Sequence, residues 1–500
     1  RGLKEYLVKI KPSSFEDIIS VVALYRPGPL DAGMVDTFIK RKHGSEKTDY
    51  LGDKDIEKVL KNTYGVIVYQ EQVMQLAQEY SGFSLGQADL LRRAMGKKIP
   101  EEMERQRPEF INGALKKGKV ERAAEGLFDQ IQTFAGYGFN KAHSAGYGLI
   151  AYQTAWLKAH YPVEFLSAAL SSDMDDSDRV RLLLDDCKNF EIDILKPDVN
   201  KSQLKFVNQG DNEILYGLGA VKGLGKAAIE NIISERQHKP FENLYDFCAR
   251  VDLSKVDKRG IEPLIKCGAM DSFNLSRKEL LESLEDAMKY AKQNTMTQES
   301  GISDLFGGIS ESNDFIPAKK DKYDDFANSK FEFSALGFYL ETHPVKEHYW
   351  ELKKIGTSSI LNTMEERMNT ISGVIIRQNR IQTRRGPLVF ATLDDGTDRI
   401  ELVISSEVLD SFEGNLNPQT IYIVSGDVTF EKDSQKKNIG LQKKMRVTDM
   451  KSLEEARMKS VTKLKINIEG QEKKDVLNII ENLKEIALIE NNTQGSQIEM

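Results

Sequence analysis

The stretch FAGYGFNKAHS gathers residue types that could bind an anion. Gly136 and Gly138 allow backbone conformations that other residues avoid, and Asn140, Lys141 and His143 stand at the start of a predicted helix. The first backbone N–H groups of a helix are unpaired and carry partial positive charge, so this position suits a phosphate or a carboxylate. A tight turn, with His143 as an ordinary helix-start residue, explains the same residues equally well.

Four cations in the segment LLRRAMGKK indicate a second anion site. They are Arg92, Arg93, Lys97 and Lys98, which fall within seven positions with no acidic residue among them. Gly96 is expected to end the helix, so the cations crowd its last turn, where one or two would already complement the helix dipole. Because arginine binds phosphate oxygens in pairs, four cations favour a triphosphate or a nucleic-acid backbone as the ligand.

The segment VKGLGKAAIENII carries the signature of a helix-hairpin-helix, a motif that binds nucleic acid without selecting sequence. Gly223 and Gly225 would expose backbone N–H groups at a helix start to a phosphate, while Lys222 and Lys226 add positive charge. Ile229 stands where the motif usually has a small residue. An ordinary glycine-rich turn between two helices is the alternative interpretation.

Alternating apolar and polar residues between 366 and 450 predict five strands with a short helix after the third. This pattern fits a small Greek-key barrel of the oligonucleotide-binding (OB) type. Its first hairpin carries four arginines, followed by an aromatic residue: Arg377, Arg380, Arg384, Arg385 and Phe390. Cations beside an aromatic ring suit single-stranded nucleic acid, although a solvated hairpin can carry the same charges.

Caps and periodicity predict the elements that position these residues. Ser84 and Gln87 resemble a capping box ahead of the first arginines. Ser144 is expected to cap the helix after the glycine-rich stretch, and Pro162 lies just past its end. The face of this helix that is expected to lie in the core is formed by Leu149, Tyr152, Trp156 and Ala159.

The chain has 500 residues, of which 70 are basic and 77 acidic. Its length predicts roughly three to five domains, and its net charge of −7 restricts any nucleic-acid surface to local patches. Three cysteines without a Cys-x-x-Cys spacing indicate a reducing compartment and argue against a zinc cluster. With no long apolar run and no signal peptide, we expect a cytoplasmic protein without a membrane partner. The first residue, Arg1, suggests a processed chain or a part of a longer one.

The composition changes along the chain predict a multidomain protein, mainly helical at first and all-β later. The predicted parts are an irregular helical domain at 1–205, small paired helices at 206–285, a linker at 286–365, the barrel at 366–450 and a short α/β segment at 451–500. The linker is polar apart from the island ISDLFGG, and apolar islands in linkers often bind partners.

The sequence offers no group suited to catalysis. Two-metal phosphoryl transfer needs carboxylates held by a rigid strand. The densest acidic group contains Asp173, Asp175, Asp176 and Asp178, and because it is polar on both sides and precedes a helix, we expect it to cap that helix and be solvated. The six histidines show no metal-ligand spacing. No catalytic or metal-binding residue is therefore expected.

From about residue 15 to about residue 450 the chain resembles the alpha subunit of bacterial DNA polymerase III. The motifs that carry the resemblance occur in the family's order: YRPGPL, YGVIVYQEQVMQLAQ, LLRRAMGKK, FAGYGFNKAHSAGY, AYQTAWLKAHYP, YGLGAVKGLG and ISDLFGG. The resemblance implies fingers at 1–205, tandem helix-hairpin-helix motifs at 206–285, a clamp-binding segment within 286–365, an OB-fold at 366–450 and the start of a further domain or a tail at 451–500.

The resemblance also implies roles for the residues of these motifs. Arg92 and Arg93 would hold the triphosphate of an incoming nucleotide, and the ring of His143 would collide with a ribose 2′-OH. The implied nucleotide-binding residues are Arg92, Arg93, Lys97, Tyr137, Asn140, Lys141 and His143. The expected DNA-binding residues are Lys222, Gly223, Gly225, Lys226, Arg377, Arg380, Arg384 and Arg385.

The family's clamp-binding motif matches Asp304, Leu305 and Phe306, with Ile302 in place of its glutamine. The implied partners are primer-template DNA, single-stranded template, dNTP, the sliding clamp and other replicase subunits. Family members bind Mg²⁺ through aspartates of a palm domain that precedes the fingers. Because this chain starts after that position, the parent is expected to be a DNA-directed DNA polymerase and this portion to be inactive alone.

Two functions remain to be separated. The first is a share in nucleotidyl transfer, with a pocket for dNTP; the second is a non-catalytic DNA-binding module that has a helix-hairpin-helix and an OB-fold but no such pocket. An accessory region of a ligase or a tRNA synthetase is disfavoured, since it leaves LLRRAMGKK and FAGYGFNKAHS unexplained.

Overall fold

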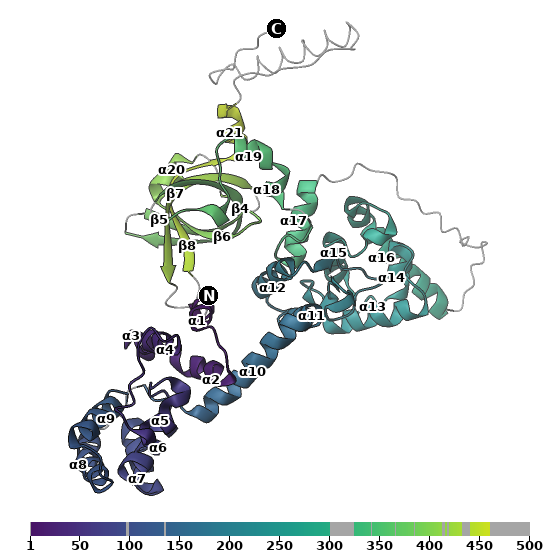
Figure 1. Ribbon diagram of the computed structural model, residues 1–500. Helices are drawn as coiled ribbons and strands as arrows, with labels where there is room; N and C mark the ends of the chain where they lie inside the picture. Colours follow the sequence, from purple (N-terminus) through teal and green to yellow (C-terminus); the bar gives the residue numbers. More distant parts are fainter. Residues whose placement is uncertain are drawn as a thin grey trace, which may run out of the picture. The chain divides into compact units, whose positions relative to one another are not determined.

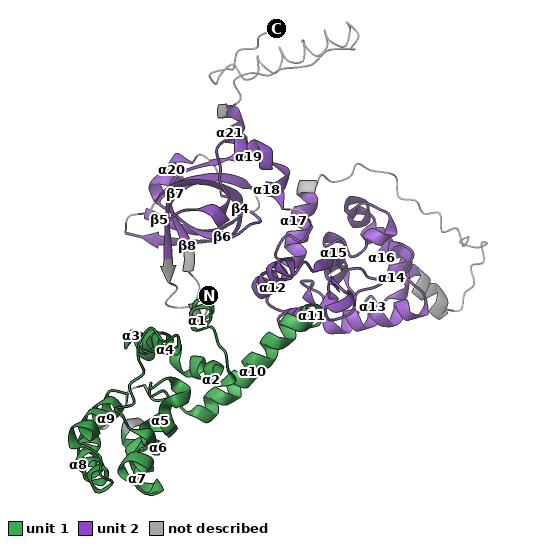
Figure 2. Cartoon of the chain, viewed as in Figure 1, with its two compact units in different colours: residues 1–165 green, residues 166–500 purple. Residues whose placement is uncertain are grey.

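The computed structural model describes most of the chain as two compact units, residues 1–165 and 166–500 (Figure 2). The residues described are 2–96, 100–134, 137–300, 325–341, 343–365, 367–384, 386–412, 416–417, 420–432 and 441–460. Several residues singled out in the sequence lie outside these ranges: Lys97, Lys98, Gly136, Ile302, Asp304, Leu305, Phe306 and Arg385.

The first unit is helical, as the sequence predicts (Figure 1). Its helices are α1 (Gly2–Ile10), α2 (Phe15–Leu24), α3 (Pro27–Asp31), α4 (Met34–Lys42), α5 (Lys54–Leu60), α6 (Gln70–Ser81), α7 (Leu85–Gly96), α8 (Pro100–Lys116), α9 (Glu121–Phe134) and α10 (Lys141–His160). The predicted capping box opens α7, because Gln87 Oε1 accepts from the Ser84 amide at 2.9 Å and Ser84 Oγ accepts from the Gln87 amide at 3.3 Å.

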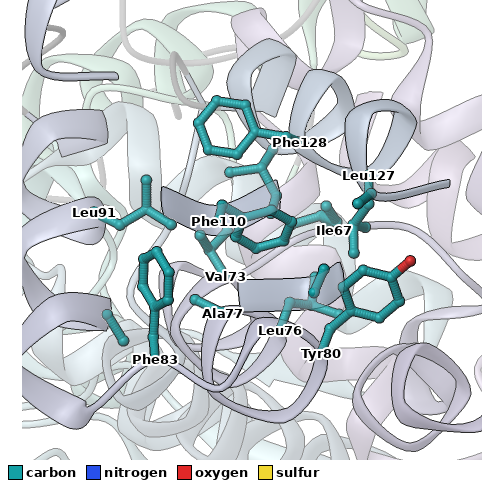
Figure 3. Packing of buried hydrophobic residues seen from close by; sticks show 14 of the residues in the cluster. Ile67, Val73, Leu76, Ala77, Tyr80, Phe83, Leu91, Phe110, Leu127 and Phe128 are labelled. Carbon is teal, nitrogen blue, oxygen red and sulfur yellow. The ribbon is translucent and has the colours of Figure 1, made fainter. Parts of the chain in front are cut away.

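One hydrophobic cluster joins helices α5 to α9. Helix α6 supplies Val73, Leu76 and Tyr80 at three- and four-residue spacing, so all three side chains point to the same face. Figure 3 shows Phe110 of α8 in the middle of this packing, with its ring centroid 5.4 Å from that of Phe128. Each fully buried large apolar side chain stabilises the fold by roughly 1.5–3 kcal/mol.

A second cluster packs α2 against the first half of α10. Gly148 allows the close approach, since a Cβ built there would lie 3.4 Å from the Cα of Ile19. Ser144 is fully buried inside α10 and Asn140 caps the helix, so the prediction that Ser144 is the cap was wrong.

The apolar face predicted on α10 is not in the core of the described structure. Leu149, Tyr152 and Trp156 are between 44% and 48% exposed, and Ala159 is also exposed. The prediction was wrong because periodicity identifies an apolar face but not the element that covers it. Only the first half of α10 carries buried residues, Ser144 and Gly148.

The second unit begins with helices, a small sheet and paired helices. Its elements up to the barrel are α12 (Ser177–Asn189), β1 (Asp193–Leu195), β2 (Val207–Gly210), β3 (Glu213–Leu215), α13 (Lys226–His238), α14 (Leu244–Arg250), α15 (Lys258–Lys266), α16 (Arg277–Ser300), α17 (Asp325–Leu336), α18 (Pro344–Glu347) and α19 (Tyr349–Lys354); α11 (Pro162–Ser172) crosses the division. The sheet order is β1-β3-β2, with β1 parallel to β3.

The predicted barrel is present and closed, with strand order β4-β5-β6-β8-β7. The strands are β4 (Met368–Thr383), β5 (Gly386–Asp394), β6 (Arg399–Ile404), β7 (Ile421–Lys432) and β8 (Leu441–Ser452), and α20 (Ser406–Ser411) follows the third of them as predicted; α21 (Leu453–Ser460) follows the barrel. Gly426 permits closure, since a Cβ there would overlap the carbonyl oxygen of Arg446 on β8. The predicted fold class is therefore confirmed.

Candidate nucleotide and nucleic-acid interface

The start of α10 is a set of hydrogen-bond donors that converge on one carboxylate. Asn140 Oδ1 accepts from the His143 amide at 2.8 Å, which is the N-cap bond. Asn140 Nδ2 donates to Glu71 Oε1 at 2.7 Å, and the Lys141 amide donates to Glu71 Oε2 at 2.9 Å. The predicted anion position is thus occupied by an internal carboxylate. Sequence reasoning missed Glu71, because nothing in its local spacing points to a partner 69 residues away.

Lys141 and His143 are both held at the surface. Lys141 Nζ forms an ion pair with Glu16 Oε2 at 3.0 Å and lies 5.5 Å from the ring centroid of Tyr69. The exposed imidazole of His143 lies between two aromatic rings, with centroids 5.5 Å from Phe139 and 4.7 Å from Tyr147. The imidazole is therefore positioned by ring contacts on both sides.

The motif YRPGPL supports the glycine-rich stretch directly. Arg26 Nη2 donates to the carbonyl oxygen of Tyr137 at 2.8 Å, and its guanidinium lies 4.2 Å from the ring centroid of Phe139. Burial lowers the pKa of Arg26. Position 28 requires glycine, since a Cβ at this position would overlap the ring of Tyr137. In the sequence this motif only carries the resemblance to a family. The structure shows that Arg26 and Gly28 position Tyr137.

Arg92 and Arg93 also share an internal carboxylate. Arg92 Nη2 lies 2.8 Å from Asp89 Oδ1, and Arg93 Nε lies 2.8 Å from Asp89 Oδ2. The hydrogen bond from Arg92, with the charges of both arginines, lowers the pKa of Asp89. The absence of an acid within LLRRAMGKK was therefore misleading, because one turn of helix brings Asp89 to the arginines.

The structure does not bring these arginines to the start of α10 within the residues it describes. Leu91 and Ala94 of α7 pack in the cluster around Phe110, whereas Phe139 and Ala145 pack in the cluster of α2. Among the described residues, the two arginines pair with Asp89 and the start of α10 with Glu71, and no hydrogen bond or ion pair joins the two groups.

The predicted hairpin has the expected backbone. Gly223 has φ of 81°, and Gly225 is the N-cap of α13. Both are exposed, and in the part of the chain that the structure describes neither backbone amide donates a hydrogen bond. Ile229 is buried in the core, so the larger side chain at this position is accommodated by packing. Lys226 lies 3.6 Å from Glu230 on the surface of the same helix.

The barrel separates the predicted arginines between two faces. Asn379 pairs with Phe390 and Arg377 pairs with Thr392, so Arg377 and Phe390 point to the same side of the sheet. Arg380 pairs with the buried Val389 and so belongs to the opposite side. Arg384 lies in the turn after β4 and is exposed. Because side chains alternate between the two faces of a strand, the arginines expected along the first hairpin do not all lie on the face of Phe390.

Asp178 joins α12 to the barrel. Its Oδ1 lies 2.8 Å from Arg399 Nη1 and its Oδ2 lies 3.3 Å from Arg377 Nη2. Burial raises the pKa of Asp178, but Arg399 and Arg377 outweigh it and lower the value. Lys222 lies in the same electrostatic environment: burial lowers its pKa, Asp178 opposes that effect and Arg377 adds to it. Sequence analysis missed Arg399 and assigned Asp178 to a solvated group.

The neighbouring Asp176 does cap α12, since its Oδ1 accepts from the amides of Asp178 and Arg179. Among the described residues, no three histidine, cysteine or acidic side chains gather in a way that could hold a metal ion. None of the helices in the described part of the chain is both long and apolar enough to cross a membrane.

A helical unit, paired helices with an exposed glycine hairpin and a closed OB-type barrel together define a multidomain nucleic-acid-binding protein. Three family models agree with this class: the finger domain of the bacterial DNA polymerase III alpha subunit matches residues 1–118, a helix-hairpin-helix motif matches 191–280 and an OB-fold nucleic acid binding domain matches 370–453.

Curated relatives identify the family. The DNA polymerase III subunit alpha of Vibrio cholerae is 43% identical over 481 residues, that of Pasteurella multocida 42% over 478, and that of Escherichia coli strain K12 41% over 490. These alignments cover 93% to 95% of this chain and 41% of each relative. The chain belongs to the DNA polymerase III alpha subunit family, and it spans about two fifths of the length of the relatives it matches.

Proposed function

We propose that this chain is part of a replicative DNA polymerase that extends primers by template-directed addition of dNTPs. In this proposal it grips the incoming dNTP, binds duplex and single-stranded DNA and attaches to the sliding clamp. The observation that carries the proposal is the identity of 41–43% to DNA polymerase III alpha subunits over nearly the whole chain.

The nucleotide-binding part rests on donors that already converge on carboxylates. Asn140 and the Lys141 amide meet Glu71, and Arg92 and Arg93 meet Asp89. Phosphate oxygens accept the same bidentate hydrogen bonds as a carboxylate, so a triphosphate can replace either of them. The two groups act on one nucleotide when primer-template DNA is bound.

His143 supports selection of the sugar. Its ring is exposed, and Phe139 and Tyr147 hold it on two sides. A ring restrained by such contacts loses less conformational freedom when it excludes a bulkier ribose. In this proposal Tyr137, whose carbonyl oxygen accepts a hydrogen bond from Arg26, also contacts the nucleotide.

The DNA-binding part rests on the hairpin and the barrel. The exposed amides of Gly223 and Gly225 and the side chains of Lys222 and Lys226 contact backbone phosphates of the duplex. Arg377, Arg380 and Arg384, with Arg385 outside the described residues, contact the single-stranded template.

The remaining parts of the proposal concern the clamp and the metal. Leu305 and Phe306, with Asp304, attach to the sliding clamp, and further replicase subunits bind the assembled enzyme. The described residues do not fit Mg²⁺, since they offer no suitable group of ligands. The proposal therefore assigns Mg²⁺ binding to a part of the polymerase outside this chain, and it expects this chain to be inactive without that part.

The test is binding of the chain to a primer-template at several salt concentrations, with and without the next correct dNTP. We expect the dNTP to tighten binding in the wild type and in the control Arg105→Ala, which removes an exposed cation of α8. The double variant Arg92→Ala/Arg93→Ala should lose the gain while keeping dNTP-free binding. If dNTP changes nothing in any variant, the chain is the non-catalytic DNA-binding module instead. Templated incorporation by the chain alone would overturn the expected inactivity.

A further inference from the structure

We propose that Lys222, Arg377 and Arg399 form one phosphate-binding site for DNA, and that the carboxylate of Asp178 occupies this site in the protein without DNA. This inference rests on the proposed DNA binding of the hairpin and the barrel. The new element is that the cations of the hairpin and of the barrel bind one phosphate together, and that Asp178 of α12 competes with the DNA for these cations.

The two ion pairs of Asp178 place its carboxylate where a phosphate could bind both arginines. Asp178 uses its two oxygens on two different guanidinium groups, at 2.8 Å from Arg399 and 3.3 Å from Arg377. A phosphodiester carries the same single charge and more acceptor oxygens, so it can satisfy both groups at once. DNA backbone phosphates are the abundant anions that this surface would meet.

The guanidinium of Arg399 is fixed in position and has one donor that lacks an acceptor in the described part of the chain. Its Nε donates to Asp394 at 2.7 Å, and Asp394 also lies 3.3 Å from His343, so the guanidinium is fixed by a buried carboxylate. Its Nη1 reaches Asp178, while its buried Nη2 has no hydrogen-bond partner among the described residues. A buried donor without a partner costs free energy, and an additional ligand oxygen would remove that cost.

The third cation is brought to the same place by α17. The Lys222 amide donates to the carbonyl oxygen of Ala335 at 2.9 Å. Gly337 then leaves room for the side chain, since a Cβ there would lie 2.5 Å from Lys222 Nζ and 2.9 Å from Ser177 Oγ. Ser177 precedes Asp178 on α12, and the carboxylate of Asp178 is close enough to raise the pKa of Lys222 against the lowering effect of burial, although the two groups form no ion pair in the described structure.

The charges favour exchange of the carboxylate for a phosphate. Two cations pair with Asp178 and Lys222 adds a third positive charge that acts on it, while Asp394 is already engaged by Arg399 and His343. The side chains of Asp178 and Arg377 are 52% and 74% exposed. The pair with Arg377 is exposed and therefore weak, and Arg399, whose side chain is 14% exposed, keeps Asp394 as a partner when Asp178 leaves. We therefore expect displacement of Asp178 to cost about a fivefold loss in affinity.

The experiment measures binding of the chain to a 20-nucleotide oligo-dT and to a primer-template hairpin across a salt series. The variants are Asp178→Asn, Arg377→Ala and the two combined. The matched control is Asp175→Asn, since Asp175 is exposed nearby and contacts none of these cations in the described structure. It removes the same charge and so reports the general effect of a less acidic surface.

We expect Asp178→Asn to tighten DNA binding about two- to fivefold, and clearly more than Asp175→Asn does. The gain should shrink when Arg377 is alanine. The salt dependence of binding should also steepen by up to about one counterion in Asp178→Asn. In this variant no carboxylate offsets the cations that neutralise the DNA phosphate, so more counterions leave the DNA on binding.

Two outcomes would overturn the inference, and they differ in what else they affect. If Asp178→Asn binds DNA no better than Asp175→Asn, Asp178 is not a competitor, although the proposed DNA binding stands. A gain that is undiminished in the Arg377→Ala background also contradicts a shared site. If the wild-type chain binds neither DNA, the proposed function itself fails and this site fails with it.

Discussion

The guanidinium of Arg26 donates a hydrogen bond of 2.8 Å to the carbonyl oxygen of Tyr137, across 111 residues of sequence. This bond fastens the chain just before α10 to the start of α3, where Gly28 faces the ring of Tyr137. The donors at the start of α10 are therefore positioned from outside the helix, and the proposed nucleotide pocket depends on residues that do not touch the nucleotide.

Gly28→Ala should destabilise the first unit by about 1–3 kcal/mol, because the added methyl group overlaps the ring of Tyr137 and forces it away. Urea unfolding followed by circular dichroism measures the change. Gly86→Ala is the matched control, since a Cβ at Gly86 in α7 meets nothing within 4 Å and alanine is the better helix former. Equal stability of the two variants would contradict the proposed packing of Gly28.

Asp17→Asn should remove an acid-sensitive part of the stability. Burial raises the pKa of Asp17, but hydrogen bonds from Lys42, the Ser13 amide and Tyr64 lower it to about 2. A lowered folded pKa stabilises the protein above the unfolded value of 3.8, and this stability is lost as the pH falls through about 2.

The contribution of Asp17 at neutral pH is about 2 kcal/mol by linkage. Removal of its charge also takes the ion pair from the buried Lys42, which keeps its hydrogen bonds to Ser13 and Tyr64. Unfolding measured from pH 7 to pH 2 should show a smaller pH dependence in Asp17→Asn than in the wild type. Asp36→Asn, at an exposed position of α4, serves as the control and should keep the wild-type profile.

Glu332→Gln should have the opposite pH dependence. Burial, together with the neighbouring Glu341, raises the pKa of Glu332 to about 7, and its carboxylate accepts from the Glu341 amide at 3.0 Å. A raised folded pKa costs stability as the pH rises from the unfolded value of 4.5 through about 7. Glutamine keeps an acceptor without the charge, so the variant should be more stable than the wild type at pH 8, by about 2–3 kcal/mol, and similar at pH 4. A variant that is less stable at pH 8 would contradict the buried, uncompensated charge.

His143→Ala should weaken the preference for dNTP over rNTP without unfolding the first unit. The ring is exposed and contributes only contacts with Phe139 and Tyr147, so its loss leaves the hydrophobic clusters intact. The measurement is the tightening of primer-template binding by the correct dNTP and by the matching rNTP. Tyr161→Ala is a control that removes an exposed ring beyond the end of α10. An unchanged preference would remove His143 from the proposed pocket.

Asp89→Asn should strengthen the effect of dNTP by a few fold at most, because the carboxylate now held by Arg92 and Arg93 lies at the surface, with 28% of its side chain exposed, and competes only weakly. The same binding assay checks this. Asp129→Asn is the control, since it removes the ion pair between Arg107 of α8 and Asp129 of α9 and does not change α7. If both substitutions change dNTP binding equally, the effect comes from net charge and not from Arg92 and Arg93.

The sequence predicted what depends on neighbours along the chain. The capping box of Ser84 and Gln87, the helix start after Gly225 and the alternation in the barrel strands all follow from backbone groups and periods within a few residues. The same reasoning failed at Ser144, because Asn140 satisfies the first turn of α10 earlier and leaves Ser144 to be buried against the helix packed beside it.

By itself, therefore, the sequence determined the family to which the chain belongs and most of the elements in their order, but it did not predict strands β1 and β2. Only the tertiary structure decided which carboxylate meets which cation. Asp178 and Arg377 are 199 residues apart, and Glu71 and Asn140 are 69 apart, so no local pattern connects them. The physical reason is range: an ion pair or a hydrogen bond acts over a few ångströms, and only folding brings such distant residues that close.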